Sequence, residues 1–195
     1  MGVRTFICLS LEDQIREALK QWQIQLRAEY GDVFRWVAPD HMHVTLSFLG
    51  DVEVEQVSAV SDSVRRAVTD LSSFRMGLSS AGAFPHPGRP RVLWAGVGAG
   101  RAIVERLQGV VTTSLHEEHG FEPDRRKFHP HVTVARASRR GLPPDMQKAL
   151  AETCSREWGA QWVERVDVMK SELRPGGPIY TVMASLPLAP GRRNC

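Results

Sequence analysis

The chain has 195 residues, of which 42% are hydrophobic and 24% charged, with a formal net charge of +3. This composition is typical of a globular protein large enough to bury its own core, and no run of about 18 apolar residues predicts a membrane span. Three separated cysteines exclude a disulfide framework and a CxxC zinc motif, and residues 1–6 show no signal peptide, so we expect a cytosolic protein with no membrane partner.

The first half of the chain predicts a strand, an amphipathic helix and a second strand. Residues 4–10 alternate as in a strand, and residues 11–28 carry apolar side chains at helical spacing, with Ser10 as the N-cap. The second strand carries His43-Val44-Thr45-Leu46. A helix over 57–68 and a strand over 74–84 follow, and the Pro-rich residues 85–90 end this half.

The second half repeats this order. Residues 91–97 predict a strand and 103–115 a helix, and the next strand carries His131-Val132-Thr133-Val134. Another helix is predicted from Pro143-Pro144 to about Trp158. The remaining predicted elements are strands over 162–173 and 179–186, a turn at 174–178 and a frayed tail over 187–195.

The two tetrapeptides lie 88 residues apart, and the same offset aligns Phe6 with Trp94. We therefore interpret the chain as a duplication with halves of about 1–85 and 91–190 inside one domain over 1–195. Residues i and i+2 of a strand share a face, so each tetrapeptide directs one imidazole and one hydroxyl to the same side. Two such strands facing each other would frame a cleft with paired histidines and threonines.

Paired histidines and threonines are suited to acid–base chemistry on a phosphate. One neutral imidazole can accept a proton and one protonated imidazole can donate one, because the unperturbed pKa of histidine is about 6.5. The threonine hydroxyls can donate to phosphate oxygens. This scheme requires no metal and no cofactor. A single histidine on a strand is most often structural, so the hypothesis depends on the pair.

A metal site is the alternative, because residues 41–43 and 129–131 both read His-x-His. A hydrolytic zinc site normally adds a carboxylate or a third histidine. Asp40 and Asp124 are the nearby carboxylates, but neither has a counterpart in the other half.

Taken together, the motifs resemble the two-histidine (2H) phosphoesterase superfamily, specifically its RNA 2′,3′-cyclic phosphodiesterases, the LigT-like or 2′-5′ RNA ligase family. The resemblance covers nearly the whole chain. The residues that carry it are Arg4-Thr5-Phe6-Ile7, Trp36-Val37-x-Pro39, His43 to Gly50, Arg91-Val92-Leu93-Trp94, Phe128-x-Pro130-His131 to Arg136, Ser171-x-Leu173 and Gly177-Pro178-x-Tyr180.

The resemblance implies a bilobed α+β fold in which duplicated β-α-β units form two antiparallel sheets, with the active-site groove between them. It implies hydrolysis of a terminal RNA 2′,3′-cyclic phosphate to a 2′-phosphomonoester, and ATP-independent 2′-5′ RNA ligation in reverse. His43 would be the proton donor, His131 the proton acceptor, and Thr45 and Thr133 the phosphate-binding residues. The partners would be RNA ends bearing 2′,3′-cyclic phosphate or related cyclic nucleotides, and we expect a monomer.

Basic and aromatic residues near the second motif are further candidates for substrate binding. No acidic residue occurs between 125 and 140, which favours an electropositive approach for an anionic substrate. Arg126 and Lys127 could contact the RNA backbone, or form a solvated loop. Phe128 could stack on a base or pack in the core, and Tyr180 could line the groove or be half-buried packing.

Strand alternation predicts on which face of its strand each of two other residues lies. Arg136 belongs to the family pattern, but its parity is opposite to that of His131 and Thr133, which directs it away from the cleft unless the strand bends. A structural ion pair is therefore an equal alternative for Arg136. Phe48 shares the parity of Val44, which predicts a core position. A non-catalytic RNA-binding module and a metallohydrolase remain as alternative functions.

Overall fold

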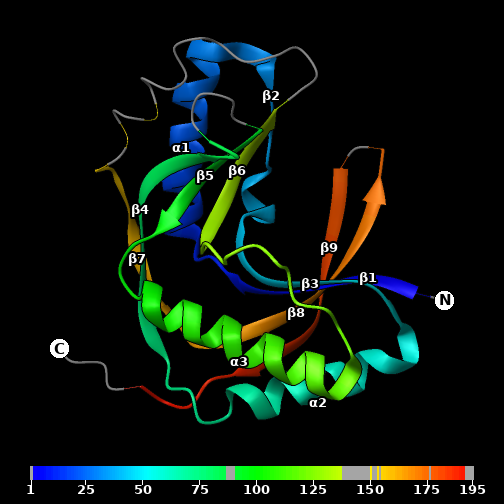
Figure 1. Ribbon diagram of the computed structural model, residues 1–195. Helices are drawn as coiled ribbons and strands as arrows, with labels where there is room; N and C mark the ends of the chain where they lie inside the picture. The colour runs from blue at the N-terminus through cyan, green and yellow to red at the C-terminus, as the bar shows by residue number, and fades with distance from the viewer. Residues whose placement is uncertain are drawn as a thin grey trace.

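The computed structural model describes residues 2–86, 91–137, 150, 153, 155–175 and 177–191 (Figure 1). Its strands are β1 (Gly2–Ser10), β2 (Phe34–Trp36), β3 (His43–Glu53), β4 (Phe74–Phe84), β5 (Val92–Val97), β6 (His131–Ala137), β7 (Glu157–Val163), β8 (Arg165–Arg174) and β9 (Gly177–Pro187). Its longer helices are α1 (Asp13–Tyr30), α2 (Val57–Val68) and α3 (Arg101–His119). Among the described helices, none has the length and apolar character needed to span a membrane.

The strands form one antiparallel sheet with a symmetric order, β7-β4-β5-β6-β3-β1-β8-β9, and β2 pairs with β6. The two motif strands, β6 and β3, lie at its centre and pair through Val44 and Val132. The expectation of two separate sheets is therefore wrong in this detail. The two halves are joined at that central pair, and the sheet curls into a half-barrel (Figure 1).

The helices pack on one face of the sheet, and a helix from each half of the chain covers strands of the other half. Helix α1 follows β1 but packs on β7, where the Trp22 and Trp158 rings lie 4.9 Å apart. Helix α3 follows β5 but packs on β3 and α2. Val44 and Val132 are fully buried on this face. The hydrophobic core thus lies between the helices and the sheet, and leaves the opposite face of the motif strands free.

Most predicted elements are present, and the differences have local causes. Helix α1 begins at Asp13 with Glu12 as N-cap, while Ser10 Oγ donates instead to Asp167 Oδ2 at 2.6 Å. The predicted strand 162–173 is divided at Glu164, between β7 and β8. Trp158 lies in β7 and not in a helix, and residues 143–149 of that predicted helix lie outside the described residues.

The predicted frayed tail is ordered over its described part. Leu188 is 7% exposed, and the backbone N–H of Ala189 donates to the Leu71 carbonyl at 2.9 Å. Gly191 N–H also donates to Ser73 Oγ. These contacts hold the chain after β9 against the segment between α2 and β4.

Candidate active site

The two tetrapeptides lie side by side in the centre of one sheet, and within each of them the histidine and the threonine share a face, as the alternation predicted. His43, Thr45, His131 and Thr133 are half-buried on the face away from the helices, while the valines between them are fully buried. Each threonine follows its histidine on the same strand face. The structure therefore brings the four residues together from both halves of the chain.

A backbone carbonyl orients each histidine ring. His43 Nδ1 lies 2.8 Å from the His41 carbonyl, and His131 Nδ1 lies 2.6 Å from the His129 carbonyl. Because a carbonyl can only accept, Nδ1 carries the proton in both rings, and Nε2 is left to exchange protons in the cleft. The short 3₁₀ helix Pro39–His41 presents the first of these carbonyls.

This arrangement gives the His-x-His spacing a role other than metal binding, since His41 and His129 contribute carbonyls to the histidine two residues later. In the part of the chain that the structure describes, no three side chains of the metal-binding types are grouped together. Asp40 is 93% exposed and lies 4.0 Å from Arg16, and Asp124 is paired with Arg126.

Aromatic rings pack around both histidines. Phe6 stacks on His43 with ring centroids 4.8 Å apart, and Tyr180 meets His43 edge-on at 5.5 Å. On the other side, Phe84 meets His131 edge-on at 5.0 Å, and Trp94 lies 4.6 Å from the His129 ring. Phe6 and Trp94 are the pair that the 88-residue offset aligned. In the strand ladders, however, Phe6 pairs with Phe48 and Trp94 pairs with Thr133, so the two rings do not occupy equivalent positions of the two halves.

Burial is the largest cause of the lowered pKa values of His43 and His131. The pKa of His43 is lowered to about 4, chiefly by burial and also by positive charge on His41, Arg136 and His131, while the hydrogen bond to the His41 carbonyl acts to raise it. The pKa of His131 is also lowered, chiefly by burial and then by His129 and Arg136. Both rings are therefore neutral at neutral pH in the free protein. A bound anion would favour the charged imidazole of either ring.

A β-bulge follows each threonine, at the same position in both motifs. Cys8 pairs with Thr45 and Ile7 with Ser47, so Leu46 is the extra residue on β3. On β6, Trp94 pairs with Thr133 and Leu93 with Ala135, so Val134 is the extra residue. A bulge shifts the alternation by one residue. Residues 48 and 136 consequently move to the face of the histidines.

The bulges correct two predictions. Phe48 is 67% exposed, with its ring 6.0 Å from Phe6, and is not in the core. Arg136 is exposed on the side of the histidines, where its charge acts to lower the pKa values of His43 and His131 and opposes the rise that burial causes in the pKa of Tyr180. The sequence contained a signal for Arg136 in the family pattern, but strand parity argued against it.

The other candidates divide into those near the histidines and those away from them. Tyr180 is half-buried, with its ring 5.0 Å from that of Phe6 and 4.8 Å from that of His41, and so lies beside the first motif. Lys127 is exposed and close enough to His129 to lower its pKa. Arg126 is 88% exposed and paired with Asp124. Phe128 is half-buried and packs on the core.

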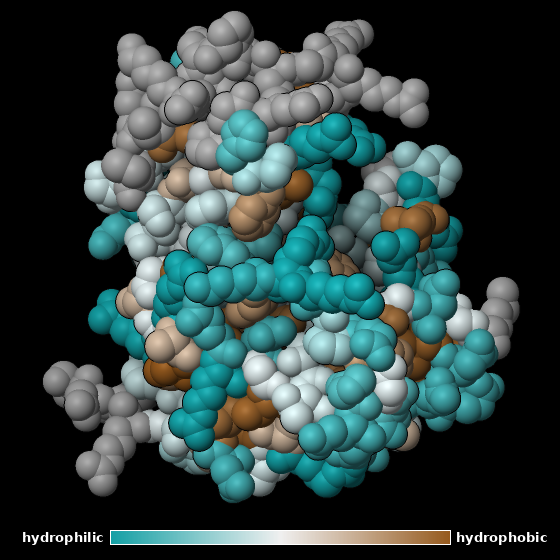
Figure 2. Space-filling view, in the orientation of Figure 1, coloured by the Kyte–Doolittle hydropathy of each residue, from teal (hydrophilic) through white to brown (hydrophobic). Residues whose placement is uncertain are grey.

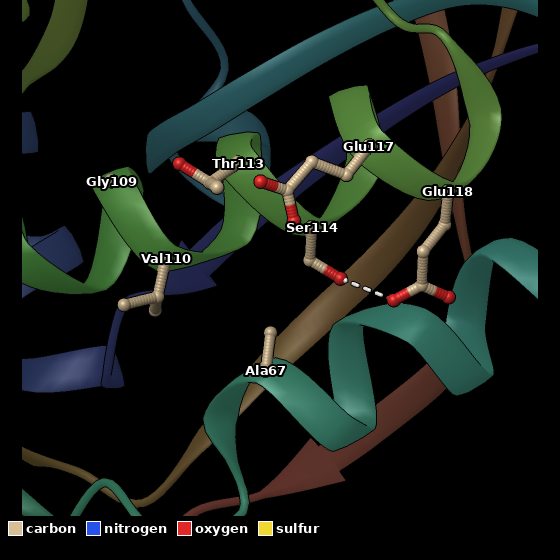
Figure 3. Close-up of a pocket in the computed structure, with 7 residues that line it drawn as sticks. All are labelled: Ala67, Gly109, Val110, Thr113, Ser114, Glu117 and Glu118. Carbon is tan, nitrogen blue, oxygen red and sulfur yellow. Dashed lines mark hydrogen bonds between the residues drawn. The ribbon is translucent and has the colours of Figure 1, made fainter.

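A hollow of about 340 Å³ lies elsewhere, between α2 and α3 (Figure 3). Glu117 and Glu118 line it, and Ser114 Oγ donates to Glu118 at 3.0 Å. Hydrogen bonds from Ser63, Arg66 and Ser114 lower the pKa of Glu118 to about 2. Two carboxylates repel an anionic substrate, so this hollow does not suit a phosphate.

Comparisons with known proteins agree with this geometry. The model of the family described as LigT like Phosphoesterase matches residues 9–94 and 102–180. The RNA 2′,3′-cyclic phosphodiesterase of Aeropyrum pernix is 34% identical over 166 residues, 85% of this chain and 93% of its own. The RNA 2′,3′-cyclic phosphodiesterase of Thermus thermophilus is 33% identical over 190 residues, 95% of this chain and 90% of its own.

Solved structures share the fold. TT0787 of Thermus thermophilus superposes with a TM-score of 0.82 at 27% identity, covering 97% of this chain and 100% of its own. LigT of E. coli complexed with 3′-AMP superposes with a TM-score of 0.75 at 26% identity, covering 96% of this chain and 99% of its own. With the matched family model, these likenesses establish that the chain belongs to the LigT-like phosphoesterase family.

Proposed function

We propose that the chain hydrolyses terminal RNA 2′,3′-cyclic phosphates to 2′-phosphomonoesters. The observation that carries the proposal is the pair of histidines on one face of neighbouring strands, each with Nδ1 bound to a carbonyl and Nε2 left for proton exchange. The curated relatives named RNA 2′,3′-cyclic phosphodiesterase support the choice of substrate.

In the proposed reaction, His131 Nε2 accepts a proton from water, and the water oxygen bonds to phosphorus. The bond from phosphorus to the 3′ oxygen breaks, and that oxygen takes the proton of His43 Nε2. The phosphate stays on the 2′ oxygen. A 5′-hydroxyl in place of water would attack the same phosphorus and form a 2′-5′ linkage, by the same proton transfers.

The neighbours of the two histidines stabilise the phosphate. Thr45 and Thr133 donate hydroxyl hydrogen bonds to its non-bridging oxygens, and Arg136 supplies a fixed positive charge. The bound anion also raises the pKa of His43 from about 4, which allows this buried ring to hold the proton that it donates. We further propose that a monomer in the cytosol suffices, because one chain provides both half-sites.

Incubation with an oligonucleotide ending in a 2′,3′-cyclic phosphate, in excess chelator, tests the proposal. We expect a 2′-phosphate product by chromatography, and its loss in His43→Ala and in His131→Ala. Binding without opening would identify an RNA-binding module instead. Activity that the chelator removes would favour a metallohydrolase, and a 3′-phosphate product would contradict the assignment of acid and base.

A further inference from the structure

The β8–β9 hairpin extends past the sheet as a two-stranded arm (Figure 1). β1 pairs with β8 only over Thr5–Cys8, opposite Asp167–Lys170. Beyond Lys170, β8 continues to Arg174 paired with β9 alone. Figure 2 shows hydrophobic surface on this arm, beside a hollow that separates it from the rest of the molecule.

One face of the arm turns toward the histidines. Ser171 pairs with Tyr180, whose ring lies 5.5 Å from His43. The next pair on that face is Leu173 with Pro178, because the bulge of this hairpin occurs earlier, between Val168 and Met169. Leu173 is 72% exposed. An apolar side chain therefore continues the wall of the cleft outward from Tyr180.

A cation lies beside the same wall. Arg4 precedes Phe6 by two residues on β1 and so shares its face, and the positive charge of Arg4 acts to lower the pKa of Tyr180 against the effect of burial. Asp51 is its partner in the strand ladder, but within the described residues no ion pair involves Arg4. Arg4 is exposed and its charge is free to meet an anion.

An apolar contact beside a free cation matches one nucleotide of single-stranded RNA, which presents a base and a phosphate. We propose that Leu173 and Arg4 bind the nucleotide preceding the one that carries the cyclic phosphate, Leu173 against its base and Arg4 at a backbone phosphate. This rests on the proposed function. The consequence is a preference for oligonucleotides over cyclic mononucleotides, which cannot reach the arm.

The test compares kcat/KM for adenosine 2′,3′-cyclic phosphate and for the adenosine dinucleotide with the same cyclic end. We expect the wild-type protein to favour the dinucleotide on the order of tenfold, near the lower end of what burial of one Leu side chain contributes. Leu173→Ala should remove most of that ratio. Arg4→Gln should reduce the ratio and its dependence on salt.

Ile179 and Arg174 lie on the other face of the same arm and provide matched controls. Ile179→Ala and Arg174→Gln should keep the wild-type ratio. Equal kcat/KM values for the two substrates in the wild-type protein would overturn the inference, as would controls that lower the ratio as much as Leu173→Ala. Failure to open either substrate would instead contradict the proposed function.

Discussion

Each motif histidine has one ring nitrogen bound to a backbone carbonyl and is buried enough to be neutral at neutral pH. The two properties act together. The carbonyl fixes which nitrogen faces the substrate, and burial makes the charged form depend on a bound anion. The residues two positions upstream thus serve the site through their backbone carbonyls, a contact that does not depend on their side chains.

Acid should destabilise the protein through these histidines. The pKa of His43 is about 4 in the folded state, below the unfolded value of about 6.5, so its stabilising contribution is complete above pH 6.5 and is lost toward pH 4. We expect the free energy of unfolding to fall by about 2 kcal/mol over this interval from His43 alone. Urea unfolding at a series of pH values measures it.

His43→Gln should flatten that pH dependence, whereas His86→Gln, at an exposed position, should leave it as in the wild-type protein. An unflattened profile for His43→Gln would show that His43 is not held neutral by burial.

Arg136 should contribute to catalysis through its charge in the cleft. Loss of a group that stabilises developing charge commonly costs about 10²-fold, so we expect Arg136→Ala to lower kcat/KM by that order, with partial recovery in Arg136→Lys. Arg106→Ala, on the exposed side of α3, is the control. Equal rates for the wild-type protein and Arg136→Ala would place Arg136 outside the reaction.

At the scale of elements, the two β-bulges explain which site residues could be assigned to the correct side of their strand from the sequence. Alternation holds over residues 43–45 and 131–133, so the sequence predicted the correct strand face for the histidine and the threonine of each motif. A bulge depends on which residues of the neighbouring strand are paired, and a single strand does not carry that information. Phe48 and Arg136 come after the bulges, and for this reason their predicted sides were wrong.

Helix α1 holds the second bulge in place. The Gln23 side chain is 7% exposed, and its Nε2 donates to the carbonyls of Val37 and Val134 at 2.7 and 2.8 Å. Gln23→Leu leaves the Val37 carbonyl without this donor and should lower the free energy of unfolding by about 2 kcal/mol. It should also lower kcat, because Val134 is the extra residue of the bulge that brings Arg136 to the face of the histidines.

Gln21→Leu is the matched control, because Gln21 is exposed on the same helix and its side chain donates to Glu17, one turn away. Denaturant unfolding and steady-state kinetics on both variants test the role of Gln23. An equal effect of the two substitutions would contradict it.

For the whole molecule, we expect unfolding to be a single cooperative transition, because each half of the chain is covered by a helix of the other half. Helix α1 covers strands of the second half and α3 covers β3 of the first, so neither half buries its own core. The sequence revealed the repeat but not this exchange, which depends on long-range packing. We expect urea unfolding followed by circular dichroism and by tryptophan fluorescence to give one coincident transition. Two separate transitions would contradict the exchange.

The central claim is that His43 donates a proton to the leaving group and His131 accepts one from water. A change of leaving group tests this claim most directly. In a cyclic phosphate whose 3′ oxygen is replaced by sulfur, the departing thiolate needs no proton. We expect this substrate to restore turnover to His43→Ala but not to His131→Ala, measured as initial rates beside the oxygen substrate. Restored turnover in His131→Ala alone would contradict the assignment and exchange the two roles.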